Sequence, residues 1–151
     1  MLPLIGVEGV TKVSASVGAE QEYFLVDDKY YQERMDLKLT GRTLFGAMAP
    51  KGQELEDHYF SSLKRKVAAF MKDLDAELWK YGIPSKTKHN EVAPAQHEVA
   101  CVYAKVNITT DNNHLLMQIA QDIAKKSKND TSNYLFHPVR YSLVFLWTKQ
   151  F

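Results

Sequence analysis

The sequence reads HNEVAPAQHE over residues 89–98, and the course of the surrounding chain depends on this decapeptide. Glu91 and Glu98 are seven residues apart, so their side chains would point to opposite faces of an uninterrupted strand. Pro94, between two alanines, cannot donate a hydrogen bond to a neighbouring strand and therefore permits a corner or a bulge. After such a corner both carboxylates can face one pocket.

A second pair of carboxylates lies on a strand predicted over residues 20–26. This segment is rich in residues that favour strands, and two aspartates follow it. Because side chains alternate along a strand, Glu20 and Glu22 point to the same face. Together with Glu91 and Glu98 they predict four carboxylates on one concave sheet.

Four clustered carboxylates cannot all stay ionised unless cations neutralise them. Oxygen ligands suit Mg²⁺ or Mn²⁺ better than zinc or copper. His89 and His97 flank the motif, and either could bind a borderline ion such as Mn²⁺ or hydrogen-bond to a ligand. The alternative at this point is plain: glutamates on strands are commonly exposed without a metal, and a flanking histidine is more often structural.

Apolar residues at steps of three and four predict amphipathic helices over residues 55–81 and 109–126. Gly82 is suited to end the first helix, and Thr110 or Asp111 to begin the second. The second helix is expected to turn four apolar side chains inward: Leu115, Leu116, Ile119 and Ile123.

The remaining segments carry weaker patterns. Residues 36–52 combine glycines and basic residues without a period and are predicted to form an extended loop, with at most a short strand over 37–39. Residues 134–151 are predicted to form one or two short strands that have no partner.

Length and composition indicate one globular domain of 151 residues, 45% of them apolar. The net charge of +1 gives no strong attraction to nucleic acid or to an anionic membrane, so neither is expected as a partner. Cys101 is the single cysteine and cannot form an internal disulfide, which fits a cytoplasmic protein. No apolar segment approaches the roughly 20 residues of a membrane-spanning helix.

Four segments together resemble one enzyme family. Residues 18–27, GAEQEYFLVD, resemble the first metal-binding strand of glutamine synthetases, and residues 86–98, KTKHNEVAPAQHE, resemble their second metal-binding segment. Residues 40–47, TGRTLFGA, and 50–60, PKGQELEDHYF, are similar to the type III branch in particular. Order and spacing agree over about residues 10–126.

The resemblance implies an α+β fold, with an incomplete, curved and mainly antiparallel sheet and both helices on its convex side. It also implies an ATP-dependent ligase that joins ammonia to glutamate through γ-glutamyl phosphate, and a homo-oligomer in the full-length family. Divalent ions, Mg²⁺ or Mn²⁺, neutralise charge on the phosphoryl group during its transfer.

Residue roles follow from the same resemblance. Glu22, Glu91 and Glu98 would hold one ion beside the glutamate site, and Glu20 would help to hold a second beside the ATP phosphates. Tyr103 stands where the family often places an aromatic residue near the nucleotide. An ordinary strand aromatic in the core is the alternative for Tyr103.

Residues 127–151 depart from the family pattern. They lack the Asn-Gly-Ser-Gly loop that supplies glutamate contacts and a histidine ligand. We therefore expect a partial catalytic domain over residues 1–126 and a divergent tail over 127–151. A fragment or truncated gene product of this kind is expected to be inactive alone.

Two other functions stay open. One is a non-catalytic remnant that binds a divalent metal or associates with a full-length synthetase subunit. The other is a different carboxylate–amine ligase or a guanidino kinase of the same superfamily, which the type III segment at 51–60 argues against.

Overall fold

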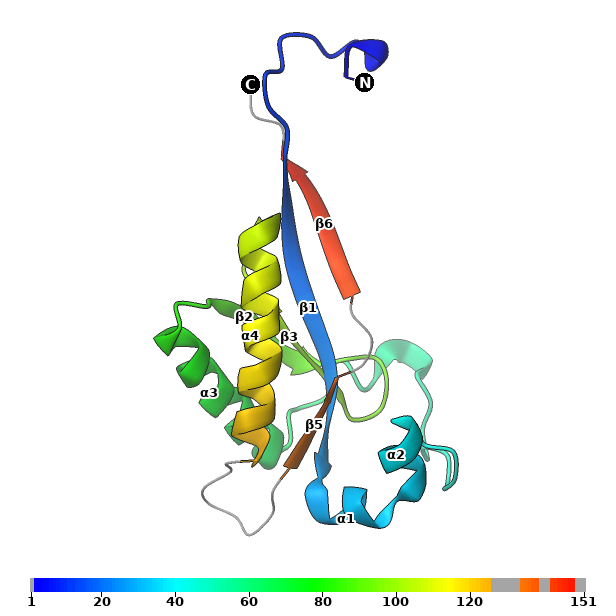
Figure 1. Ribbon diagram of the computed structural model, residues 1–151. Coiled ribbons are helices and arrows are strands. Elements are labelled where there is room, and N and C mark those ends of the chain that lie inside the picture. Colours follow the sequence, from blue (N-terminus) through cyan, green and yellow to red (C-terminus); the bar gives the residue numbers. More distant parts are fainter. Residues whose placement is uncertain (1, 126–133, 139–141, 149–151) are drawn as a thin grey trace.

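The structure is a computed structural model that describes residues 2–125, 134–138 and 142–148. Its longest strand, β1 (Ser14–Asp27), runs through the centre of a six-stranded sheet (Figure 1). The other strands are β2 (Ser85–Asn90), β3 (Gln96–Cys101), β4 (Ala104–Lys105), β5 (Tyr134–Pro138) and β6 (Ser142–Thr148). Every pairing is antiparallel.

Both edges of β1 are occupied. Tyr23 and Phe24 pair with β3 and also with β5, and Ser16 and Val17 pair with β4 and also with β6. Therefore β3 and β4 lie along one edge of β1, β5 and β6 lie along the other, and β2 lies outside β3. The predicted curved antiparallel sheet with flanking helices is confirmed.

The expectation that the strands after residue 134 have no partner is wrong, because β5 and β6 both pair with β1. A strand of 14 residues presents backbone donors and acceptors along both edges, and a second set of strands can use them. The remainder of the predicted segment lies outside the described residues.

Two long helices, α3 (Arg65–Lys80) and α4 (Val106–Lys125), cover one face of the sheet (Figure 1). Alternate residues of β1 point toward them and are buried, whereas the intervening residues are only half-buried. The largest fully buried apolar side chains of the resulting core are Tyr23, Leu74, Leu78, Ile83 and Leu116. The opposite face of β1 carries the acidic residues.

The first long helix begins ten residues later than its periodicity predicts. Residues before Arg65 form turns and a 3-10 segment, η2 (Glu54–Glu56), in which Leu55 has a φ of 57°. Leu55 is 89% exposed, so it does not belong to the buried face of a helix, although its spacing from the next apolar residues predicts one. The end is as predicted: Gly82, with a φ of 70°, donates to the carbonyl of Trp79, and Ile83 donates to that of Leu78.

The second long helix begins at Val106, before the predicted residues Thr110 and Asp111. Leu116 and Ile119 are buried and Ile123 packs against the core, but Leu115 is 45% exposed. The expectation for Leu115 is therefore wrong, because adjacent helix residues lie about 100° apart and only one of two neighbours can face the sheet.

Residues 41–52 contain neither helix nor strand, as predicted, but the start of the predicted loop is helical. Two short helices follow β1: α1 (Asp28–Glu33) and α2 (Met35–Thr40), which is capped by Gly41 with a φ of 66°. The expected strand over 37–39 is therefore wrong. A short 3-10 segment, η1 (Leu2–Ile5), precedes the sheet. Within the described part of the chain, no helix has both the length and the apolar character needed to cross a membrane.

Candidate metal centre

The half-buried face of β1 carries Glu20 and Glu22. Glu22 lies directly opposite Glu98 of β3, and Glu20 lies opposite Ala100. Opposed residues of an antiparallel pair point to the same face of the sheet. The three glutamates therefore share the face that α3 and α4 leave uncovered.

A tight turn connects β2 to β3 and moves Glu91 onto this face. The amide of Glu91 donates to the carbonyl oxygen of Gln96 at 2.8 Å, which closes the turn. Ala95 adopts a φ of 58° within it. Pro94 lies in this turn, outside both strands, so the break in the ladder occurs where the sequence predicts it.

Among the residues that the structure describes, His89, Glu91 and Glu98 form a group of possible metal ligands. One ligand atom from each lies within 4.8 Å of the others. His89 Nδ1 is 3.5 Å from Glu91 Oε1, and His89 Nε2 is 3.4 Å from Glu98 Oε1. The side chain of Glu98 is 10% exposed and that of His89 is 30% exposed, so the group is open to solvent on the histidine side.

Burial is the main cause that raises the pKa of Glu98 to about 7. A hydrogen bond with Glu91 and the negative charges of Glu20 and Glu91 act in the same direction, and His89 opposes them. Neighbouring carboxylates raise one another's pKa, and a cation bound beside them would lower it.

Glu20 and Glu22 lie beside this group and are not among its three members. The negative charge of Glu20 is one of the causes that raise the pKa of Glu98. Gln96 donates a hydrogen bond from Nε2 to Oε2 of Glu22 and so orients that carboxylate. Sequence reasoning missed Gln96, although its position two residues before Glu98 on one strand places both on the same face.

The two histidines of the motif separate onto opposite faces. His89 pairs with Glu98 across the strands and faces the carboxylates, whereas His97 pairs with Tyr23 and Asn90. His97 is 5% exposed, and its ring centroid lies 5.7 Å from that of Tyr23. Of the two ligands considered from the sequence, the structure leaves only His89 beside the carboxylates.

Tyr103 is 56% exposed and therefore does not belong to the core. Its Cβ lies 3.5 Å from the position that a Cβ on Gly18 would occupy. Gly18, Glu20 and Glu22 are spaced two residues apart on β1 and therefore lie on the same face, so Tyr103 borders that face. Its role in nucleotide binding stays a prediction.

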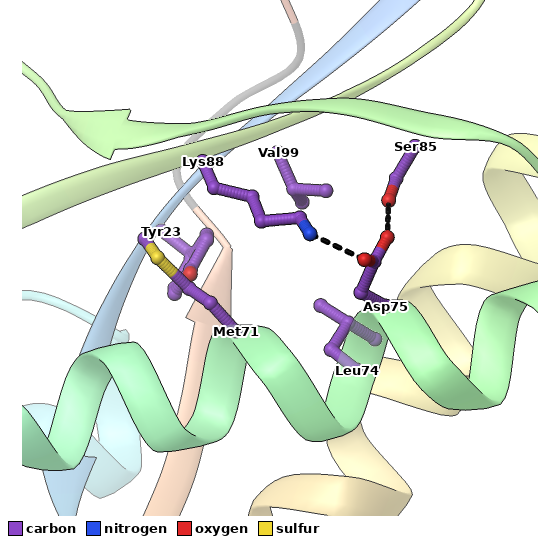
Figure 2. Close-up of a pocket in the computed structure, with 7 residues that line it drawn as sticks. All are labelled: Tyr23, Met71, Leu74, Asp75, Ser85, Lys88 and Val99. Carbon is purple, nitrogen blue, oxygen red and sulfur yellow. Dashed lines mark hydrogen bonds and ion pairs between the residues drawn. The ribbon is translucent and has the colours of Figure 1, made fainter.

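A polar cluster behind the sheet has a structural role (Figure 2). Asp75 of α3 accepts hydrogen bonds from Lys88 and Ser85 of β2. Burial would raise the pKa of Asp75, but these hydrogen bonds lower it. Lys88 pairs with Val99, so this cluster lies on the helix side of the hairpin, away from the carboxylates. It fixes α3 to the edge of the sheet.

Comparisons with known proteins identify the family of this chain. Residues 7–138 match the family described as glutamine synthetase, catalytic domain. The chain is 58% identical over 126 residues to a glutamine synthetase of Butyrivibrio fibrisolvens and 51% identical over 119 residues to that of Bacteroides fragilis (strain YCH46). It is 45% identical over 115 residues to the type-3 glutamine synthetase of Dictyostelium discoideum.

The fold matches a solved structure as well. The cryo-electron microscopy structure of Plasmodium falciparum glutamine synthetase aligns over 87% of this chain and 29% of its own, with a TM-score of 0.57 and 16% identity. The curved antiparallel sheet with two helices on one face therefore has the glutamine synthetase catalytic fold. The chain belongs to the glutamine synthetase catalytic-domain family, and the relatives it matches include the type III branch.

The chain corresponds to a limited part of these proteins. The alignments cover 83%, 79% and 76% of this chain, but 18%, 16% and 16% of the three curated relatives. The match to the family extends to residue 138, and the boundary expected at residue 126 stays a prediction.

Proposed function

We propose that this chain supplies the first metal-binding part of a glutamate–ammonia ligase. Glu22, Glu91 and Glu98 would hold one Mg²⁺ or Mn²⁺, and Glu20 would contribute to a second ion. The observation that carries the proposal is the convergence of Glu91 and Glu98 on His89, with Glu22 directly opposite Glu98.

The residues present fit a divalent cation. Carboxylate oxygens are the ligands that Mg²⁺ and Mn²⁺ prefer, and the histidine nitrogen is compatible with Mn²⁺. The raised pKa of Glu98 supports the same assignment, because a cation would neutralise the mutual repulsion of these carboxylates. When bound, such an ion supplies positive charge that stabilises a phosphoryl group in transfer.

The chemistry proposed for the whole protein is the family reaction, in which ATP, glutamate and ammonia form glutamine through γ-glutamyl phosphate. In that reaction the carboxylates of this chain would bind the cation and fix its position. Glu22, oriented by Gln96, and the carboxylates of the hairpin keep their oxygens on one face of the sheet. Tyr103, exposed at the border of this face, is the proposed contact for the nucleotide.

We further propose that the described residues bind the cation without completing the reaction. An acyl phosphate hydrolyses unless water is excluded from it. The acidic face of β1 is half-buried, with neither α3 nor α4 covering it. Purified chain incubated with Mn²⁺, ATP, glutamate and ammonia should release phosphate at the background rate. Turnover above background would contradict this part of the proposal.

A second function, association with another synthetase subunit, is favoured by the surface of the segment between α2 and α3. Large apolar side chains of this segment are well exposed, among them Phe45, Met48 and Phe60. Apolar side chains this exposed would be covered if the segment contacted another chain. This function is compatible with cation binding and with a homo-oligomer of the full-length protein.

Titration calorimetry with Mn²⁺ and Mg²⁺ tests the metal site. Glu91→Gln should weaken Mn²⁺ binding about tenfold or more, which corresponds to about 1.4 kcal/mol. Glu33→Gln is the matched control, because Glu33 is exposed on α1 and lies outside the acidic face. Unchanged Mn²⁺ affinity in Glu91→Gln would remove Glu91 from the site, and absence of binding to the wild-type chain would refute the proposal.

A further inference from the structure

Asn90, the last residue of β2, makes three hydrogen bonds that no other residue of the motif combines. Its side-chain Nδ2 donates to the carbonyl oxygen of Ser61 at 2.8 Å. Its Oδ1 lies 2.9 Å from Nδ1 of His97, and its backbone carbonyl oxygen lies 2.8 Å from Nδ1 of His89. One residue therefore contacts both histidines and the segment that precedes α3.

These contacts determine where the proton sits on the His89 ring. A carbonyl oxygen can only accept, so Nδ1 of His89 must carry the hydrogen that it shares with Asn90. In the neutral ring, Nε2 then carries a lone pair. Nε2 is the nitrogen that lies 3.4 Å from Glu98 Oε1, so the lone pair is on the side of the acidic group.

The Asn90 side chain also keeps a neighbouring aromatic ring against His89. The bond to Ser61 fixes the backbone of the segment that carries Tyr59. The ring centroids of Tyr59 and His89 are 5.1 Å apart, with an angle of 56° between their planes. His89 is thus confined by the Asn90 carbonyl at Nδ1 and by Tyr59 beside its ring.

We propose that Asn90 is a positioning residue that holds His89 in the Nδ1–H form and directs Nε2 toward the cation held by Glu91 and Glu98. This inference rests on the proposed metal site and deepens it. A neutral imidazole nitrogen favours Mn²⁺ relative to Mg²⁺, whereas carboxylates serve both ions. Asn90 therefore contributes to selection of Mn²⁺ by acting through His89, without being a ligand itself.

Nuclear magnetic resonance of the metal-free chain tests the positioning step directly. Long-range proton–nitrogen spectra of ¹⁵N-labelled histidine distinguish the two neutral forms of each ring. The wild-type chain should show His89 with hydrogen on Nδ1. Asn90→Ala keeps the backbone carbonyl but removes the two side-chain hydrogen bonds, to Ser61 and His97, that anchor residue 90, so it should give a mixture of both forms. Asn107→Ala, an exposed asparagine of α4, is the control and should leave the spectrum unchanged.

A double-mutant cycle then tests the link to metal selection. Asn90→Ala should lower Mn²⁺ affinity about tenfold, a typical effect for residues that orient metal ligands, and lower Mg²⁺ affinity less. In a His89→Gln background, Asn90→Ala should have no further effect on the ratio of the two affinities. An equal loss in both backgrounds would show that Asn90 does not act through His89.

The outcomes separate this inference from the metal site itself. Wild-type His89 with hydrogen on Nε2 would overturn the proposal for Asn90, and this measurement needs neither a variant nor a metal. If the wild type binds no cation while His89 carries hydrogen on Nδ1, the positioning step holds and the proposed function fails. If Mn²⁺ binds but Asn90→Ala changes neither the spectrum nor the affinity ratio, the proposal for Asn90 fails alone.

Discussion

Glu98 combines burial, a neighbouring carboxylate and a partner across the strands. Its position opposite Glu22 places two acidic side chains side by side, an arrangement that costs stability while both are charged. Burial, followed by the hydrogen bond with Glu91 and the charges of Glu20 and Glu91, raises the pKa of Glu98 to about 7. A proton and a divalent cation therefore compete for the same oxygens.

This competition predicts that Mn²⁺ affinity rises with pH. Below about pH 7, Glu98 must release its proton before it can bind the ion, so affinity should increase up to tenfold per pH unit and level off above the pKa. Calorimetry in buffers of different ionisation enthalpy should also detect proton release near pH 6. A pH-independent affinity between pH 5.5 and 8 would show that Glu98 is not a ligand.

Asp36 predicts a different dependence on pH. Arg34 donates from Nε and Nη2 to its carboxylate, and the amides of Leu44 and Phe45 also donate to it. The Arg34 hydrogen bonds hold the pKa of Asp36 well below its usual range, against the opposing effect of burial. A folded-state pKa below the unfolded value stabilises the fold above the unfolded pKa, and this contribution is lost as the pH falls through the folded pKa.

Asp36→Asn should therefore lower the free energy of unfolding at pH 7, and this effect should begin to shrink below about pH 4 and shrink further as the pH falls toward the folded-state pKa. Urea unfolding at pH 7 and pH 3 provides the measurement. Asp73→Asn, an exposed position on α3, serves as the control and should change little at either pH. An Asp36→Asn effect of the same size at both pH values would contradict the role of the charge.

Among the elements, α4 shows how one helix selects its buried face. Leu115 is 45% exposed, whereas its neighbour Leu116 is fully buried between α3 and the sheet. Thr109 of the same helix bonds to the carbonyl of Val17, and Asn113 bonds to Gln21. These bonds to β1 fix the rotation of the helix about its axis.

Leu116→Ala should cost about 2–5 kcal/mol of unfolding free energy, because it leaves a cavity in the core. Leu115→Ala, the same change one residue earlier, should cost less than about 1 kcal/mol. Chemical denaturation of both variants is the measurement. Equal losses would mean that α4 packs in a different rotation.

At the scale of the whole molecule, the candidate metal centre links three strands. Glu22 belongs to β1, His89 to β2 and Glu98 to β3, and Glu91 to the turn between the last two. A cation bound by these side chains would couple the central strand to the hairpin at the edge of the sheet. Binding to the folded state alone raises the stability of the whole domain.

Mn²⁺ at about 100 times its dissociation constant should therefore raise the free energy of unfolding by about 2.7 kcal/mol. For a domain of this size, that corresponds to an increase in Tm of roughly 5–10 °C. Scanning calorimetry of the wild type, Glu91→Gln and Glu33→Gln is the measurement. The increase should persist in Glu33→Gln and fall by about half or more in Glu91→Gln, and an equal increase in all three would place the ion elsewhere.

Local patterns were sufficient for much of the acidic face. The shared face of Glu20 and Glu22 follows from alternation along one strand. The convergence of Glu91 and Glu98 follows from the turn between them, which the proline in this segment indicated. Gly82 ends α3 as predicted, because a left-handed residue is a local requirement. Such features depend on residues close together in the chain.

Where the prediction failed, the cause lay in residues far apart in the chain. Leu55 fits the apolar spacing of the predicted helix, but it is exposed and packs in no core. Leu115 and Leu116 are the same residue type, and only their orientation relative to the sheet makes one exposed and the other buried. Pairing of β5 and β6 with β1 joins segments more than 100 residues apart, and no local pattern in these segments identifies the partner strand.

The amino-acid sequence alone determined the family, the acidic residues and the faces to which most of them point, because these depend on residue type and on short-range geometry. Only the tertiary structure decided that His89 rather than His97 lies beside the carboxylates, that Gln96 donates a hydrogen bond to Glu22, and that Asn90 contacts both histidines. Those choices arise where separate strands meet, since a hydrogen bond between distant residues exists only after the backbone has brought its donor and acceptor together.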